Sequence, residues 1–383
     1  MPLIMSGDCK QRIFGLQPAE RLRRQVAVLG SECNIAADAS AVLSEGTLLW
    51  LQQNPGTVFV SASGRPMAVS HPHGRDEASL SGLQTQKRSV TSGSADYFNR
   101  QLRRREPIFG FSLAETAVVD AERQLFDGVY KGVTDIVTKW VWPTPAFWVT
   151  RLLARHNVSP NAVTAVGILC MFIAAFLFAV GSIGAGLVAA WLMTFLDTVD
   201  GKLARVTVRS SRVGNLLDHW TDVVHPPFWW ICIPIGIIAN DPQAALMTEA
   251  TALILLSYVV GRIAEVTFKL QLGFNQFIWR PFDAAFRLVI ARRNTILLLV
   301  TVGALIGTLP EAWLAVAAWS VASALVQCVR LVQGWLQRPI GSFLSTEQDI
   351  LLISLSPAER LARETAERSA PAATPRQEKG PAA

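Results

Sequence analysis

The stretch DTVDGKLARVTVRSSRVGNLLDHWTD, residues 197–222, has four aspartates and lies between two strongly apolar segments. GSIGAGLVAAWLMTFL precedes it and VVHPPFWWICIPIGIIA follows it. A charged side chain costs about 2.5–3.5 kcal/mol at the centre of a membrane helix, and less near the interface. Four acids at the ends of two apolar segments therefore need a functional or structural reason.

The composition is too apolar for an ordinary soluble protein. Of the 383 residues, 51% are hydrophobic and only 17% are charged, and the apolar excess lies after about residue 162. Several runs approach the roughly 17–25 residues that a spanning helix needs. These runs are residues 162–180, 181–196, 223–239, 242–261, 294–310 and 312–329. We therefore predict an all-α integral membrane domain of six transmembrane helices, preceded by a small soluble α/β domain.

Basic residues between the runs set the predicted orientation, because lysine and arginine are retained on the cytoplasmic side. They gather between the second and third runs and between the fourth and fifth, whereas the alternate connections hold only Asp241, Glu249 and Glu311 or no charge. We expect both termini and the four aspartates on the cytoplasmic side, at the inner membrane if the protein is bacterial. This bias explains most of the net charge of +6, so no nucleic-acid partner is expected.

The chain divides into four predicted regions. They are a soluble α/β domain (1–90), an amphipathic juxtamembrane helical segment (91–145), the membrane domain (146–340) and a mostly disordered tail (341–383). The juxtamembrane segment either lies along the membrane surface or packs on the soluble domain. MPLIMSGDCKQRIFG has no apolar core of a cleavable signal peptide. The cysteines form no CxxC pair, which predicts no disulfide framework.

Within residues 1–90, apolar runs and turn residues predict the secondary structure. QVAVLG (25–30) and TVFVSAS (57–63) indicate strands, with a helical pattern around residues 41–53 between them. Gly64-Arg65 predicts a hairpin-like return into PMAV, and residues 71–94 are rich in the small and polar residues of a loop.

Helical periodicity brings the four aspartates of the opening stretch together. A helix advances about 100° per residue, so offsets of three, four and seven share one face. One face consists of Asp197, Asp200, Gly201 and Ala204, and a face of the next helix consists of Gly214, Asp218 and Asp222. Because only residues 206–213 separate the two patterns, the two helices must be antiparallel neighbours. The four carboxylates can then converge.

Converging carboxylates repel one another, so a cation is needed. Arg205 can neutralise only one of them. Oxygen ligands in this number suit Mg²⁺, Mn²⁺ or Ca²⁺, and a rise of roughly 4.5–6 Å between the paired acids suits two metal ions. A diphosphate could then dock, and Gly201, Ala204 and Gly214 leave room for it.

Two other interpretations of the acids stay open. They could pair with the neighbouring cations as a solvated interface; these cations are Lys202, Arg205, Arg209 and Arg212. Acids on membrane helices can also form the ion pathway of a cation transporter. A pathway should run through the membrane, however, and these acids gather at one face.

The spacing Asp197-x-x-Asp200-Gly201-x-x-Ala204-Arg205, then eight residues, then Gly214-x-x-x-Asp218-x-x-x-Asp222 resembles the signature of the CDP-alcohol phosphotransferases at every fixed position. VSPNAVT (158–164) resembles the segment that opens the first membrane helix of that family. The resemblance implies an enzyme with six membrane helices that forms a homodimer. It implies transfer of a substituted phosphate from a CDP-alcohol to an acceptor hydroxyl, with release of CMP.

The resemblance also implies a role for each motif residue. Asp197, Asp200, Asp218 and Asp222 would bind two divalent ions, Mg²⁺ or Mn²⁺, and Asp222 would also be the general base. Gly201, Ala204, Arg205 and Gly214 would bind the CDP group, with Arg205 at the diphosphate. The chemistry agrees, because in-line attack needs a deprotonated hydroxyl and neutralised phosphoryl charge.

The region before the motif resembles a narrower group of proteins. FNRQLRRREP (98–107), YKGVTDIVTK (130–139) and Trp142-Pro143 are similar to the joining segment of fused inositol-phosphate cytidylyltransferase and di-myo-inositol phosphate phosphate synthase proteins. The front domain departs from that pattern. VAVLGSECNIAADAS has Gly30 and a single Asp38 but no glycine-rich nucleotide loop, so we interpret residues 1–90 as a reduced nucleotidyltransferase-like module.

This narrower resemblance implies a polyol phosphate acceptor, such as an inositol phosphate. The candidate acceptor-binding cations are Arg151, Arg155, Arg262 and Lys269. Arg262 is favoured because it adjoins an apolar run and is followed by Glu265, although each cation could instead anchor the protein at the membrane surface. The alternative enzyme is a phospholipid synthase that uses CDP-diacylglycerol. His219 is predicted to be interfacial, and His225 with the two following prolines to kink the third helix.

Overall fold

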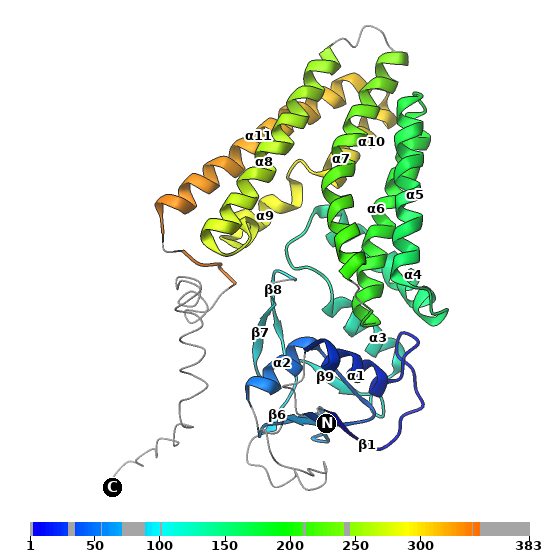
Figure 1. Cartoon of the computed structure of the whole chain (residues 1–383), viewed down its shortest axis with the longest axis vertical. Coiled ribbons are helices and arrows are strands. Elements are labelled where there is room, and N and C mark those ends of the chain that lie inside the picture. Colours follow the sequence, from blue (N-terminus) through cyan, green and yellow to red (C-terminus); the bar gives the residue numbers. More distant parts are fainter. Residues whose placement is uncertain are drawn as a thin grey trace.

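A bundle of long apolar helices is stacked on a smaller domain of strands and short helices along the longest axis of the molecule (Figure 1). The computed structural model describes residues 3–29, 35–54, 56–70, 89–99, 102–209, 212–240, 246–338 and 340–344. Inside these ranges, the side chains of residues 29, 97, 98, 106, 212–220, 222, 239 and 240 are not described.

The front domain is built on a mixed sheet with the strand order β1-β2-β5-β4-β6. Its strands are β1 (Leu3–Ser6), β2 (Ile35–Asp38), β4 (Val58–Val60), β5 (Pro66–Ser70) and β6 (Ser89–Val90). α1 (Pro18–Leu29) connects β1 to the parallel β2. α2 (Glu45–Gln53) begins after Ser44, whose side chain accepts a hydrogen bond from the Thr47 amide. These elements bury a core around Leu22, Leu48 and Phe59.

Part of the predicted secondary structure of this domain is confirmed. The strand within 57–63 is β4, the return at Gly64-Arg65 leads into the antiparallel β5, and the helix within 41–53 is α2. The strand at 25–30 is wrong, because α1 covers residues 25–29. Leu22 and Val26, one helical turn apart, are both buried in the front-domain core. Of the loop predicted at 71–94, residues 71–88 lie outside the described part.

The segment 91–145 is only partly helical, which corrects the helix predicted from residue 96. β7 (Asp96–Asn99) and β8 (Arg104–Pro107) form an antiparallel hairpin, and β9 (Gly110–Ser112) pairs with β3 (Ala41–Leu43) of the front domain. The backbone reverses at Arg103, which has a φ of 53°, so the predicted helix is interrupted there. α3 (Val118–Gly128), the π-helical turn η2 (Val137–Val141) and α4 (Pro143–Arg155) follow.

The membrane domain consists of long helices with short connections. Its elements are α5 (Pro160–Ala179), α6 (Ile183–Val206), α7 (Arg212–Asn240), α8 (Leu246–Leu272), the 3₁₀ turn η3 (Gln276–Ile278), α9 (Pro281–Val289), α10 (Arg293–Ile306) and α11 (Leu309–Leu336). Four of the described helices are long and apolar enough to cross a membrane: α5, α6, α8 and α11. A fifth span results if α9 and α10, which meet at 43°, are taken as one.

The prediction of six spans is therefore supported for four or five of them. The remaining predicted span falls in α7, whose apolar part covers only Val223–Ile238. The polar half of the opening stretch, residues 212–222, occupies the first part of this helix. A helix that begins with motif residues leaves fewer residues to face lipid.

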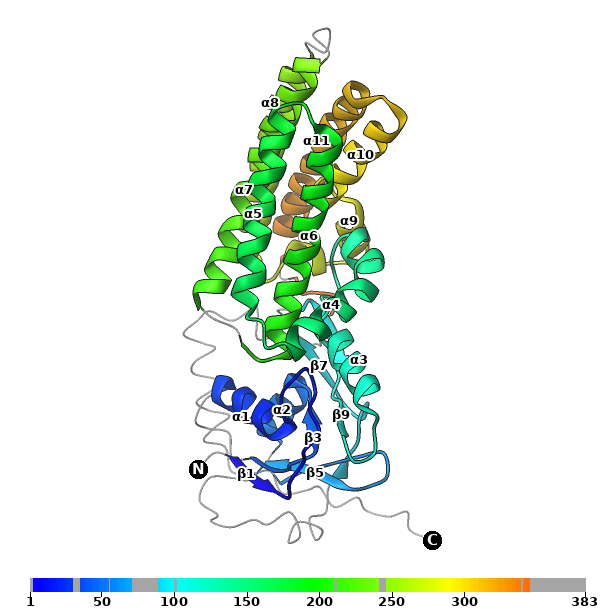
Figure 2. The ribbon, with the colours of Figure 1, turned by 90° about the vertical axis from the view of Figure 1, so that its right-hand side faces the viewer.

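Close packing in the bundle depends on small residues and on tryptophans with hydrogen-bonded ring nitrogens. A Cβ atom on Gly236 of α7 would lie 1.9 Å from the carbonyl oxygen of Phe178 on α5, so this crossing requires glycine. Trp229 donates its indole N–H to the Met171 carbonyl at 3.0 Å. Figure 2 shows α5, α6 and α7 running side by side over most of their length. The motif helices α6 and α7 are thus both packed closely on α5.

The front domain is docked directly on the C-terminal end of α6. Val199, Leu203 and Val206 of α6 share a buried cluster with side chains of the front domain and of α3 and α4. Two arginines of α1 donate to the last carbonyls of α6: Arg21 Nη1 to Val206 at 2.5 Å and Arg24 Nη1 to Thr207 at 3.2 Å. Cations at a helix C-terminus are stabilising, so the front domain holds the end of the motif helix.

Glu122 of α3 connects three of the docked segments. Its side chain is 1% exposed, accepts the Phe14 amide at 2.9 Å and pairs with Arg151 Nε of α4 at 2.5 Å. Removing one partner of a buried pair leaves an uncompensated charge. The Arg151–Glu122 pair is therefore a structural contact between α3 and α4.

Replacing Glu122 by alanine should lower the free energy of unfolding by about 3–5 kcal/mol, because it strands the Arg151 charge. Thermal unfolding of the purified protein in detergent, followed by tryptophan fluorescence, measures the change. Asp127→Ala on the same helix is the matched control, since Asp127 forms only an exposed 3.8 Å pair with Arg123 and should cost about 1 kcal/mol or less. Equal unfolding temperatures for the two variants would contradict a structural role of Glu122.

Candidate functional site

Two motif aspartates of α6 line one cavity. The cavity is lined by Thr164, Gly167, Ile168, Met193, Asp197, Asp200 and Thr221. Asp200 is buried, and its Oδ2 accepts a hydrogen bond from Thr164 Oγ1 of α5 at 2.6 Å. Thr164 lies near the start of α5. This helix begins after Ser159, whose side chain accepts a hydrogen bond from the Ala162 amide and caps the helix. The start of α5 therefore positions a hydroxyl group against Asp200.

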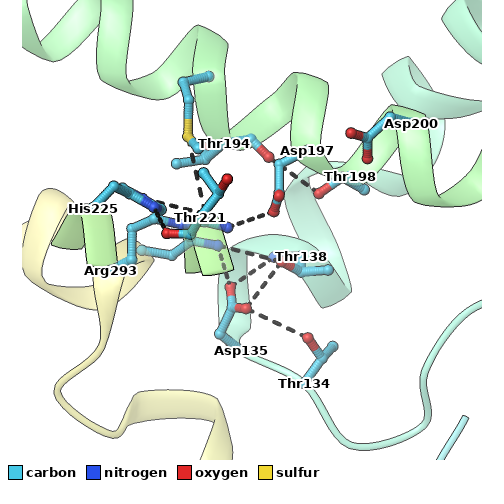
Figure 3. A network of polar contacts seen from close by, with 12 residues as sticks. Thr134, Asp135, Thr138, Thr194, Asp197, Thr198, Asp200, Thr221, His225 and Arg293 are labelled. Atoms are coloured by element: carbon cyan, nitrogen blue, oxygen red, sulfur yellow. Dashed lines mark hydrogen bonds and ion pairs between the residues drawn. The ribbon is translucent and has the colours of Figure 1, made fainter. Parts of the chain in front are cut away.

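An arginine from α10 pairs with the other aspartate. Arg293 Nη2 donates to Asp197 Oδ2 at 2.6 Å, and its Nη1 is 3.5 Å from His225 Nε2. His225 is buried, and its Nδ1 contacts the Thr221 carbonyl oxygen. Figure 3 shows this network, in which α6, α7 and α10 each provide a member. The histidine thus contacts the arginine that neutralises Asp197 and helps to orient it.

The second half of the motif lies on α7. Gly214, Asp218 and Asp222 fall within its helical backbone, as predicted, but the side chains of both aspartates lie outside the described part. His219 also lies outside it. Thr221 precedes Asp222 directly and lines the cavity of Asp197 and Asp200. The short connection after α6 places the two motif halves on neighbouring helices.

The described acids suit a hard divalent cation by their donor chemistry. Asp197 and Asp200 offer carboxylate oxygens to one cavity, and Mg²⁺ and Mn²⁺ take such ligands. Among the residues whose side chains are described, no group of three or more histidines, cysteines, aspartates or glutamates could hold a metal ion. The α7 acids, whose side chains are not described, would have to complete the ligand set.

Three further motif residues follow on α6. Gly201 is one residue after Asp200, and Ala204 and Arg205 lie one helical turn further toward the C-terminal end of α6. A Cβ atom on Gly201 would lie 3.7 Å from Arg205 Nη1, so these two residues are adjacent in space. Arg205 is exposed, in contrast to the buried Lys202 of the same stretch, whose Nζ donates to the Val129 carbonyl at 2.9 Å.

A second cavity, which we call the arginine cavity, borders the first at Arg293. It is lined by Asp135, Pro226, Tyr258, Arg262, Arg287, Arg292, Arg293 and Asn294. An adjoining cavity shares Tyr258, Arg262 and Arg292 with it and is also lined by Ser257, Ser320, Ser323 and Gln327. Several buried atoms of these walls have no hydrogen-bond partner: Arg262 Nε, Arg287 Nε and Nη1, Ser320 Oγ and Gln327 Oε1. Buried polar atoms are normally paired, so the unpaired donors among them, which are the arginine nitrogens and the Ser320 hydroxyl, indicate a ligand site for an anion. Gln327 Oε1 is an acceptor and suits a hydroxyl group of a ligand.

Two acids partly neutralise the arginines of this cavity. Glu265 of α8 accepts from Arg262 at 3.5 Å, from Arg292 and from the Asn275 side chain at 3.1 Å. Asp135 accepts from the Thr138 amide at 3.0 Å and from Asn294 Nδ2 at 2.9 Å.

The electrostatic environment keeps Asp135 ionised. Burial raises the pKa of its carboxyl, but the charge of Arg287 and hydrogen bonds from Thr138 and Asn294 outweigh burial and leave the pKa below its usual range. The cavity therefore keeps its ion pairs near neutral pH.

The candidate acceptor-binding residues are distributed unevenly. Arg262 lines both the arginine cavity and its neighbour. Arg151 is paired with Glu122, and Arg155 and Lys269 are exposed; none of the three lines a cavity named above. Sequence reasoning missed Arg287, Arg292, Arg293, Asn294 and Asp135. The available signal was Arg292-Arg293-Asn294 at the start of an apolar run, which was interpreted only as an orientation signal.

Residues 157–329 match the CDP-alcohol phosphatidyltransferase family. The chain contains a CDP-alcohol phosphatidyltransferase domain. It is a transferase, and its apolar helices indicate an integral membrane protein. The transferase domain includes the whole motif of residues 197–222 and the arginines of α8 to α10, whereas the front domain and the hairpin β7–β8 lie outside the matched residues.

The transferase domain is also similar to a solved structure. A crystal structure of Mycobacterium tuberculosis phosphatidylinositol phosphate synthase with CDP-DAG bound matches at 20% identity with a TM-score of 0.40, covering 50% of this chain and 97% of that chain. No curated protein matches the chain. The likeness of the joining segment to fused cytidylyltransferase proteins stays a prediction.

Proposed function

We propose that this transferase moves a substituted phosphate from a CDP-alcohol to a hydroxyl group of an acceptor that itself has a phosphate, with release of CMP. The observation that carries the acceptor class is the arginine cavity, which borders the motif aspartates through Arg293. Its unpaired donors suit a phosphate group. The serines and glutamine of the adjoining cavity suit hydroxyl groups, so a polyol phosphate such as an inositol phosphate fits both chemistries.

The motif residues bind the donor in this proposal. Two divalent ions, Mg²⁺ or Mn²⁺, would be held by Asp197, Asp200, Asp218 and Asp222. The cytidine pocket would be lined by Gly201, Ala204 and Gly214, and Arg205 would contact the diphosphate. Bound divalent ions would neutralise phosphoryl charge and stabilise the leaving CMP. Thr164 fixes the orientation of Asp200 by its hydrogen bond. Asp222 acts as the general base and takes the proton from the attacking hydroxyl group of the acceptor.

The arginine cavity binds the phosphate of the acceptor. Arg262, favoured from the sequence, contributes from α8, and Arg287 and Arg292 contribute from α9 and the start of α10. A hydrogen bond between charged groups contributes about 1.5–3 kcal/mol, so two or three arginines suffice for selective binding. We assign the exposed Arg155 and Lys269 to anchoring at the membrane surface and Arg151 to its structural pair with Glu122.

The same site is compatible with two classes of donor. A CDP-polyol would make the enzyme a soluble-polyol synthase, and CDP-diacylglycerol would make it a phospholipid synthase; the motif binds the CDP end that both share. The alternative of a cation transporter loses its basis, because the acids lie inside the matched transferase domain. We further propose that both termini are cytoplasmic, because lysine and arginine gather in the connections on that side. We also propose a homodimer, which the family resemblance implies.

The donor and acceptor are tested by CMP release from the purified protein in detergent with Mg²⁺. CDP-diacylglycerol and CDP-inositol are compared as donors, each with glycerol phosphate, inositol phosphate or inositol. We expect CMP with a phosphorylated acceptor and one of the two donors, and loss of about 10²-fold or more in Asp222→Asn, because general-base catalysis contributes that much. No CMP with any pair, or an active Asp222→Asn enzyme, would refute the proposal.

The metal role has its own test. Mn²⁺ binding to the detergent-solubilised protein, measured by electron paramagnetic resonance, should weaken at least about tenfold in Asp197→Asn, because a charged ligand is lost. Asp120→Asn, at an exposed position of α3, is the control and should bind as the wild type does. EDTA should stop CMP release, and Mg²⁺ or Mn²⁺ should restore it. Equal Mn²⁺ affinity in both variants would remove Asp197 from the ligand set.

A further inference from the structure

The hairpin β7–β8 extends from the front domain to the transferase domain. Figure 1 shows it directed toward the ends of α8 and α9. At its tip, the carbonyl of the buried Leu102 accepts the Gly132 amide at 2.8 Å. A Cβ atom on Gly132 would lie 2.6 Å from Arg104 Cβ and 2.9 Å from the Arg103 carbonyl oxygen. The tip is therefore packed closely against the segment that leads to Asp135 in the arginine cavity.

Arg103 at this tip has an unfavourable backbone conformation. Its φ is 53°, in the left-handed region that glycine adopts without steric cost and other residues rarely adopt. Strained residues of this kind concentrate at ligand-binding and catalytic sites. The presence of an arginine instead of a glycine at this turn therefore points to a functional role of the Arg103 side chain.

The charged neighbours of Arg103 are those of the arginine cavity. Burial lowers the pKa of its guanidinium group; Glu265 opposes this effect, and Arg292 and Arg262 add to it. Glu265 already accepts hydrogen bonds from Arg262 and from Arg292. Arg103 thus adds a positive charge to a cluster whose nearest carboxylate is already shared.

The charge balance of the cluster leaves room for a dianion. The cluster has four arginines and two carboxylates: Arg103, Arg262, Arg287 and Arg292, with Asp135 and Glu265. Arg293 does not add to the excess, because it is paired with Asp197. Among the described residues this leaves two uncompensated positive charges. A phosphate monoester has a charge of about −1.5 to −2 at pH 7, so it matches this excess.

We infer that Arg103 of the front domain is a phosphate-binding residue of the acceptor site, so that the acceptor is held between the front domain and the transferase domain. This inference rests on the proposed function, because it assigns the arginine cavity to the acceptor. The strained turn, the close packing of the hairpin tip on Gly132 and the charge excess all support it. Acceptor selection then depends on a residue that lies outside the matched transferase domain.

The test uses the full-length protein in detergent with saturating donor and varied inositol phosphate. Arg103→Gly removes the charge and suits the positive φ, so the hairpin should keep its fold. It should raise the KM for inositol phosphate about tenfold or more and leave the KM for the donor unchanged within about twofold, because a charge-assisted hydrogen bond to the acceptor is lost. Arg103→Lys, which keeps the charge without the planar fork, should give an intermediate KM.

Arg105→Gln is the matched control, because Arg105 lies on the same hairpin and donates to the Leu344 carbonyl at 3.1 Å. The rise in melting temperature with inositol phosphate alone gives a readout without turnover, and it should shrink in Arg103→Gly but not in the control. If the wild type neither binds nor uses inositol phosphate, the proposed acceptor class fails together with the inference. If the wild type does both and Arg103→Gly matches Arg105→Gln, only the role of Arg103 fails.

Discussion

Compensation of partly buried charge at one end of an apolar bundle is the constraint on which the site depends. Asp197 on α6 and Arg293 at the start of α10 form an ion pair, with Oδ2 and Nη2 2.6 Å apart, and so neutralise each other. Such pairs gain little net stability, because desolvation offsets most of the attraction, but losing one partner is costly. The pair therefore fixes where α10 meets α6. It also forms the common wall between the cavity of the motif acids and the arginine cavity.

This arrangement separates two kinds of anion binding. In the proposed reaction, the donor diphosphate would need cations beside the acids, whereas the acceptor phosphate would need fixed positive charge from the protein itself. Arg262, Arg287 and Arg292 come from α8, α9 and the start of α10, and they converge because α9 and α10 meet at a bend of 43°. A straight α9–α10 helix would not turn its basic connection toward α8. The bend is thus part of how the proposed acceptor site is formed.

The sequence placed the motif residues on two helices, as α6 and α7 show, because helical spacing is a local property. Offsets of three, four and seven placed Asp197, Asp200 and Gly201 on one helix face without any tertiary information. It could not predict the arginine cavity, whose members are far apart in the chain and meet only through packing. The hairpin β7–β8 was missed for a related reason: FNRQLRRREP has few apolar residues, so its charge pattern was interpreted as a helix face, whereas a turn at Arg103 and pairing across the hairpin determine its structure.

The front domain is integrated into the enzyme by specific contacts. Arg21 and Arg24 bind the end of α6, Glu122 connects α3 to α4, and the hairpin tip lies on Gly132. These contacts hold the motif helix and one wall of the arginine cavity in a fixed relation. The front domain therefore contributes to the geometry of the proposed acceptor site, whose other walls lie in the transferase domain.

The most direct test of the account is the ratio of kcat/KM for inositol phosphate to that for inositol, in the wild type and in Arg287→Gln. Arg287 lines the arginine cavity and has two buried nitrogens without partners, so it should bind the acceptor phosphate. We expect a wild-type preference of at least about 100-fold for the phosphorylated acceptor, most of which the variant loses. An equal ratio in the two proteins would contradict the assignment of this cavity to the acceptor phosphate.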